Sequence, residues 1–258
     1  IALFGLIPVV FLLFATLSVR RATLASYLFA WLFLPMAGYQ IPGLPDYTKT
    51  SATSVCVLLA GVLFAGQAFT KFRFRWFDIP MLVYCLVPVV SSVTNGLGLY
   101  DGMSCALSQT VMWGMPYFAG RVLLADPSAP LDVATAIFVG GLVYVPLCLF
   151  EIKMSPQLHI MVYGYHQHSF MQTVRMGGWR PTVFMQHGLM VAIWMISASI
   201  AGIWLWRTGA VQRLRGIQVG WLVIPLVVTA VLCKSVGAIT LLAAGLAGAG
   251  WGLGSAAF

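Results

Sequence analysis

Three histidines and two arginines are concentrated in one polar stretch of an otherwise apolar chain. The stretch runs from residue 166 to residue 191, in a protein of 258 residues of which only 8% are charged. Its ionisable residues are His166, His168, Arg175, Arg180 and His187. Ionisable groups are costly in an apolar environment and usually mark functional sites, so we expect the chemistry of this protein here.

The order of residues around Arg180 predicts that it lies at the mouth of a helix. Pro181 is suited to a first helical turn, and residues 182–206 are almost entirely apolar. His187 would then share a helix face with Arg180, roughly 10 Å deeper. In one interpretation Arg180 snorkels to the membrane interface and His187 bonds a neighbouring helix. With Arg175 and Gln186 close by, we favour an outward-facing cavity that holds an anion at its rim.

Lys234 is the third cation of this predicted site, because it interrupts a long apolar stretch near the end of the chain. Together with Arg175 and Arg180 it suits a phosphate or diphosphate, for which arginine offers a planar fork and lysine a point charge. Nucleotide sugars are not present outside a cell. An enzyme that builds bonds there must use a pre-activated, lipid-linked donor, and a diphosphate is the expected leaving group.

A sugar transfer also requires a group that takes the proton of the acceptor hydroxyl. The candidates are His187, His168 and Glu151, and Trp179 is expected to form a surface for sugar stacking. No metal site is predicted, because the His166–His168 pair has no neighbouring Cys, Asp or Glu. No cofactor is predicted either, since the chain has neither a GxxxxGK[ST] loop nor a GxGxxG motif.

The composition predicts an all-α, polytopic transmembrane helical bundle. The chain is 60% hydrophobic with a mean hydropathy of +0.94, and its apolar runs are long and continuous, which favours helices over barrel strands. We expect one membrane domain: six spans in 1–150, an outward-facing loop over 151–181 and three spans in 182–258. The nine predicted spans are 1–19, 22–38, 52–70, 79–95, 103–124, 131–150, 182–206, 217–233 and 236–258.

The distribution of basic residues predicts the orientation in the membrane. Nine Lys and Arg fall on one side and five on the other, and short basic loops stay in the cytoplasm. The first group is Arg20, Arg21, Lys71, Arg73, Arg75, Arg121, Arg207, Arg213 and Arg215. The loop 151–181 then faces outward. The net charge of +8 is a topological signal, and we expect no nucleic-acid partner.

Two motifs resemble those of the bacterial O-antigen ligase and polysaccharide polymerase superfamily. The first is Trp179-Arg180-Pro181-Thr-Val-Phe184-Met-Gln-His187-Gly188-Leu, and the second is Leu232-Cys-Lys234-Ser235-Val-Gly237-Ala238. The resemblance covers residues 100–258. In two respects the chain departs from the family: Gly188-Leu189 stands where many members carry Asn, and no large outer loop follows the second motif. The chain begins with Ile, and we expect it to be part of a longer protein.

The resemblance implies a metal-independent glycosyltransferase in the bacterial inner membrane that polymerises or ligates surface polysaccharide. Its donor would be a polyprenyl-diphosphate-linked glycan and its acceptor a glycan or a lipid. Arg180 would hold the diphosphate, and His187 would be the base. The alternatives are a transporter or flippase for an anionic or lipid-linked solute, and a non-catalytic assembly subunit. The glycines of the last span allow another helix to approach closely, and they are Gly248, Gly250, Gly252 and Gly254.

Overall fold

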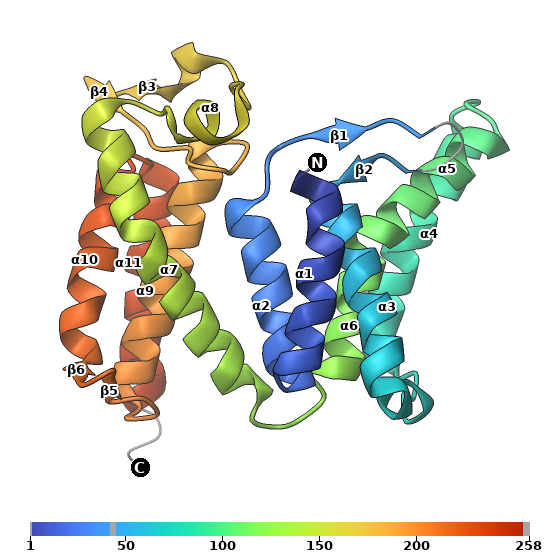
Figure 1. The fold of residues 1–258 in the computed structure, drawn as a ribbon, viewed down its shortest axis with the longest axis horizontal. Coiled ribbons are helices and arrows are strands. Elements are labelled where there is room, and N and C mark those ends of the chain that lie inside the picture. The colour runs from blue at the N-terminus through green and yellow to red at the C-terminus, as the bar shows by residue number, and fades with distance from the viewer. Residues whose placement is uncertain (1, 42–44, 255–258) are drawn as a thin grey trace. The chain divides into compact units, whose positions relative to one another are not determined.

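The protein is built from helices that form two compact units, residues 1–129 and residues 130–258. The computed structural model describes residues 2–41 and 45–254, with side chains as far as residue 247. Within these residues the only strands form short two-stranded antiparallel hairpins (Figure 1). The predicted all-α class is confirmed. The surroundings of Gly248, Gly250, Gly252 and Gly254 lie outside the side chains described.

Unit 1 contains six α-helices, of which the last two are joined through a π-helical turn. A capping box begins α3, in which Thr48 Oγ1 accepts from the Ser51 N–H and Ser51 Oγ accepts from the Thr48 N–H. In order, the elements are α1 (Ala2–Thr16), α2 (Val19–Phe33), β1 (Gly38–Tyr39), β2 (Tyr47–Thr48), α3 (Lys49–Thr70), η1 (Trp76–Asp78), α4 (Ile79–Thr94), α5 (Leu99–Gln109), η2 (Thr110–Gly114) and α6 (Met115–Leu123).

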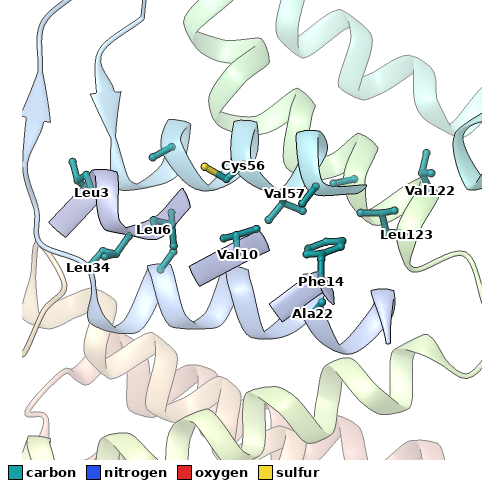
Figure 2. Close-up of a cluster of buried hydrophobic side chains, with 14 residues drawn as sticks. Leu3, Leu6, Val10, Phe14, Ala22, Leu34, Cys56, Val57, Val122 and Leu123 are labelled. Carbon is teal, nitrogen blue, oxygen red and sulfur yellow. The ribbon is translucent and has the colours of Figure 1, made fainter. Parts of the chain in front are cut away.

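The core of unit 1 lies between α1, α2, α3 and α6. Figure 2 shows Leu6, Val10 and Phe14 of α1 facing the other helices, and each is less than 5% exposed. Small residues such as Ala22 and Ala60 let the backbones approach closely, which is how helices pack in lipid. This core fixes the relative positions of the ends of α3 and α6.

Unit 2 contains the predicted site. Its elements are α7 (Ala129–Met154), α8 (Leu158–Tyr163), η3 (Phe170–Thr173), β3 (Val174–Arg175), β4 (Gly178–Trp179), α9 (Gly188–Arg207), β5 (Arg213–Leu214), β6 (Ile217–Gln218), α10 (Val219–Leu232) and α11 (Val236–Gly254). The segment with α8, β3 and β4 lies at one end of the unit 2 helices, and the β5–β6 hairpin lies at the opposite end (Figure 1).

Close helix contacts hold unit 2 together. Helix α9 packs against α10 and α11, and α7 meets α9 at two glycines. A Cβ on Gly141 would overlap Ala198, and a Cβ on Gly202 would lie 2.6 Å from the Phe138 ring. These contacts fix the end of α7 beside the start of α9.

The exposed surface of the helices is strongly apolar. In α4, Leu82, Val83, Leu86 and Val90 are each at least half exposed, a pattern that soluble monomers rarely show. Among the described residues, four helical segments are long and apolar enough to cross a membrane: Lys49–Thr70, Trp76–Thr94, Ala129–Met154 and Gly188–Arg207. The chain is therefore a membrane protein.

The predicted number of nine spans is not confirmed. Each of the nine predicted ranges does contain a helix, but several of these helices are short. Helices α1 and α10 have 15 and 14 residues, whereas about 20 are needed to cross the hydrocarbon layer. The predicted span 103–124 is divided by the π-helical turn η2.

Candidate functional site

The segment between α7 and α9 is folded and ends in a tight hairpin. Strands β3 and β4 pair Val174 with Trp179 and Arg175 with Gly178. Both turn residues, Met176 and Gly177, have positive φ values of 47° and 67°. The two-residue turn is therefore formed by Met176 and Gly177. It places Arg175 and Arg180 at the two ends of one short ribbon.

Helix α9 begins later than predicted, and this corrects the expected relation between Arg180 and His187. The helix starts at Gly188 with His187 as its N-cap, and Pro181 lies outside it. The Glu151 carboxylate accepts hydrogen bonds at 2.8 Å from the N–H groups of both Thr182 and Val183, which holds this segment in a non-helical form. Arg180 and His187 are thus not two helical turns apart on one face.

Arg180 nevertheless lies at the mouth of α9, because its side chain folds back over the first residue of the helix. A Cβ built on Gly188 would lie 2.7 Å from Cγ and 2.9 Å from Nε of Arg180. Arg180 is 8% exposed, and its buried Nε has no hydrogen-bond partner among the described residues. Burial, and secondly the charge of Arg175, lower the pKa of Arg180. A buried guanidinium Nε without a partner, beside a helix N-terminus, is compatible with the binding of an anion.

Lys234 lies beside the hairpin that carries Arg175 and precedes Arg180. It lies in the turn between α10 and α11 with a φ of 52°. Its ammonium group donates to the Met176 carbonyl at 3.3 Å, and a Cβ built on Gly178 would overlap this ammonium group. The structure therefore gathers all three predicted cations around β3 and β4.

His168 and His187 lie in direct contact. Their ring centroids are 4.2 Å apart in an edge-to-face arrangement, and His168 Nδ1 accepts a hydrogen bond from the Ser169 N–H. Burial, then His168, then Arg180 and Arg175 lower the pKa of His187. His187 is therefore neutral at neutral pH and is able to accept a proton.

Trp179 belongs to an aromatic group beside the hairpin. The centroid of its ring lies 5.2 Å from that of Phe170, and the Phe170 centroid lies 5.2 Å from that of His166. Trp179 is half-buried, so part of its surface remains open. His166 Nε2 is buried without a hydrogen-bond partner. The arrangement is compatible with the stacking role expected of Trp179.

Comparison of the chain with protein-family models, with curated proteins and with solved structures finds no match. The resemblance to O-antigen ligases thus remains an expectation from the two sequence motifs.

Glu151 has a different role from the base that we expected. Its side chain is fully buried, with Oε1 accepting from the Leu158 N–H at 3.0 Å and Oε2 accepting from Thr182 and Val183. Both carboxylate oxygens are occupied by backbone donors, so Glu151 cannot reach an acceptor sugar. It is a positioning residue that connects the end of α7 to the segment before α9.

Sequence reasoning missed two residues that organise this segment. Gln167 donates from Nε2 to the carbonyls of Val183 and Met185, at 3.1 Å and 3.0 Å. His159 is buried, and its Nδ1 lies 2.8 Å from the Tyr165 carbonyl. The only sequence signal was the position of Gln167 between two histidines. Within the described residues, no three His, Cys, Asp or Glu side chains are grouped as metal ligands.

Proposed function

We propose that this protein is a membrane glycosyltransferase that takes its sugar from a polyprenyl-diphosphate-linked donor. The acceptor is a glycan or a lipid, and the reaction belongs to surface polysaccharide synthesis at the outer face of the bacterial inner membrane. One observation carries the proposal. The buried Nε of Arg180 lacks a partner at the N-terminus of α9, while Arg175 and Lys234 lie around the same hairpin.

The three cations fit the leaving group of such a reaction. A departing diphosphate gains negative charge as the glycosidic bond breaks, and donors fixed in advance stabilise this charge most effectively. Arg180 offers a planar fork beside the positive end of the α9 dipole. Lys234 is fixed by its bond to the Met176 carbonyl, so little reorganisation is required when the donor binds.

The histidine pair supplies the second half of the reaction. The acceptor hydroxyl oxygen forms a bond to the anomeric carbon, the bond from that carbon to the diphosphate breaks, and the electron pair leaves with the diphosphate. His187 takes the hydroxyl proton, since its lowered pKa keeps it neutral beforehand. His168, in edge contact with His187, orients the ring. Trp179 stacks against a sugar of the donor or acceptor.

Native mass spectrometry of the detergent-purified protein with a polyprenyl diphosphate tests the binding step. We expect an adduct with the parent protein, a strong loss of it with Arg180→Ala and partial retention with Arg180→Lys. Arg207→Ala is the matched control, because Arg207 is exposed at the other end of α9. An adduct that is equally abundant in Arg180→Ala and the parent would contradict the assignment.

Cell-surface glycan profiling tests the reaction. A strain carrying only the Arg180→Ala protein should make less polymer or shorter polymer than the parent and the Arg207→Ala strain. If the diphosphate adduct depends on Arg180 but polymer length and amount stay unchanged, the cations bind a transported solute and the enzyme assignment is wrong. If neither adduct nor polymer depends on Arg180, the chain acts as an assembly subunit.

A further inference from the structure

A cleft at one end of unit 1 is lined by four cationic side chains. The ends of α3 and α6 lie beside each other (Figure 1). The cleft lined by residues from both ends has a volume of about 330 Å³. Its positive charge comes from Lys71, Arg73, Arg75 and Arg121, and its apolar lining includes Phe72 and Val122. The sequence accounted for these basic residues only as a signal of membrane orientation. In the structure they surround a cleft that is large enough for a small ligand.

The acidic side chains near the cleft are already neutralised. Asp78 is 4% exposed, and its Oδ1 and Oδ2 lie 2.8 Å and 3.2 Å from Nε and Nη2 of Arg121. Tyr117 also donates to Asp78 Oδ1. Asp126, which follows the cleft residue Ala125, pairs with Arg20 at 3.3 Å. Asp78 and Asp126, the carboxylates described near the cleft, therefore compensate no further positive charge.

Three of the cations have no counter-charge. In the described part of the chain, Lys71, Arg73 and Arg75 are exposed and form no ion pair with a carboxylate. Like charges in one cleft repel each other, so an anion that enters it is favoured over an empty, solvated cleft. Arginine and lysine together are the side chains that proteins use to hold phosphate groups.

The aromatic residues beside the cleft place it at a membrane surface. Phe74 and Trp76 are 58% and 80% exposed, and both adjoin the membrane-spanning segment Trp76–Thr94. Tryptophan is enriched where the hydrocarbon layer meets the headgroups, and large exposed aromatic rings are otherwise unfavourable. The exposed aromatic rings therefore favour a location of the cleft near the lipid headgroups, on the side that the charge distribution predicts to be cytoplasmic.

We propose that this cleft binds the phosphate group of an anionic phospholipid of the inner leaflet. Arg73 and Arg75 grip the phosphate with their guanidinium groups, Lys71 adds a point charge, and the acyl chains lie along α3 and α4. Basic pockets between membrane helices on the cytoplasmic side bind lipid headgroups in this way. The proposal rests on unit 1 only and does not depend on the proposed glycosyltransferase activity.

The test compares lipid retention by the parent protein and three variants, two of which lose the same number of positive charges. The first three proteins are the parent, Lys71→Gln/Arg73→Gln/Arg75→Gln and Arg207→Gln/Arg213→Gln/Arg215→Gln. Each is purified in detergent and titrated with phosphatidylglycerol or phosphatidylcholine. Native mass spectrometry then measures the bound lipid. The second triple variant is the control, because its arginines are exposed and carry the same charge on the same predicted side. A fourth protein, Lys71→Arg/Arg73→Lys/Arg75→Lys, keeps the charge of the cleft.

We expect the parent, the Arg207/Arg213/Arg215 control and the charge-conserving variant to retain phosphatidylglycerol in preference to phosphatidylcholine. The cleft variant should bind phosphatidylglycerol on the order of tenfold to a hundredfold more weakly. Equal retention by the cleft variant and the parent would overturn the proposal, and so would equal losses from both neutralised variants. Inorganic phosphate forms the remaining arm: if it binds as tightly as the lipid, the ligand is free phosphate and the lipid assignment is wrong.

Discussion

The carboxylate of Glu151 binds the backbone N–H of Val183 at 2.8 Å, and Val183 has a φ of 49°. A positive φ is strained for a β-branched residue, so it persists only where surrounding contacts enforce it. Here the N–H group is held by Glu151 and the carbonyl by Gln167. This arrangement delays the start of α9 until Gly188 and thereby brings Arg180 over the helix N-terminus.

Replacing Glu151 should loosen the whole site. Glu151→Gln loses charged acceptors for three backbone N–H groups, which we expect to cost about 2 kcal/mol or more and lower Tm by roughly 5 °C. Thermal unfolding in detergent measures the loss, and limited proteolysis of residues 155–187 reports the loosening. Lys153→Gln, on the exposed part of the same helix, is the control and should leave both unchanged. An unaltered Tm in Glu151→Gln would contradict the positioning role.

Gly188→Ala should weaken diphosphate binding without lowering the stability of the protein. Alanine favours a helix over glycine by about 1 kcal/mol, so the variant should remain folded. Its Cβ would nonetheless lie within 3 Å of three Arg180 side-chain atoms and push the guanidinium away. We expect diphosphate retention to fall as in Arg180→Ala while Tm stays within a few degrees of the parent. Gly120→Ala in α6, where the added Cβ meets nothing within 4 Å, should change neither quantity.

The stability of the protein should depend on the protonation of His187. Its pKa is lowered in the folded state from about 6.5 in the unfolded chain. At pH values between the folded-state pKa and the unfolded-state pKa, the unfolded state binds more protons, so the free energy of unfolding rises with pH. This stability is present above about pH 6.5 and is lost as pH falls through the folded pKa. His187→Gln should reduce the difference in Tm between about pH 5 and about pH 8, and an identical difference would refute the shift.

The charge of Lys234 can be removed without disturbing the backbone conformation at this position. Its φ of 52° lies in the left-handed region, where asparagine is tolerated and β-branched residues are not. Lys234→Asn should keep Tm within about 2 °C and weaken diphosphate retention, because the ammonium group beside Met176 is lost. Lys234→Val should also unfold at a lower temperature through backbone strain. A Lys234→Asn protein that binds the diphosphate as the parent does would exclude Lys234 from the site.

Sequence alone determined the helical class, the membrane environment and the candidate site residues. Long apolar runs have no alternative to helices in hydrocarbon, because every backbone polar group must be satisfied internally. For that reason each predicted range contains a helix, although the number of nine spans is not confirmed. The grouping of Arg175, Arg180 and Lys234 was also predictable, since charged residues are rare in this chain and the topology assigns these three to one side.

Only the tertiary structure decided where α9 begins and what Glu151 does. Pro181 and an apolar run predict a helix from Thr182, but local propensity is weak compared with a buried carboxylate that binds the Thr182 and Val183 N–H groups from 31 and 32 residues away. Such long-range hydrogen bonds leave no periodic signal in the sequence. The same holds for the contact of His168 with His187 and for the cleft in unit 1, where α3 and α6 meet only because their apolar faces pack together.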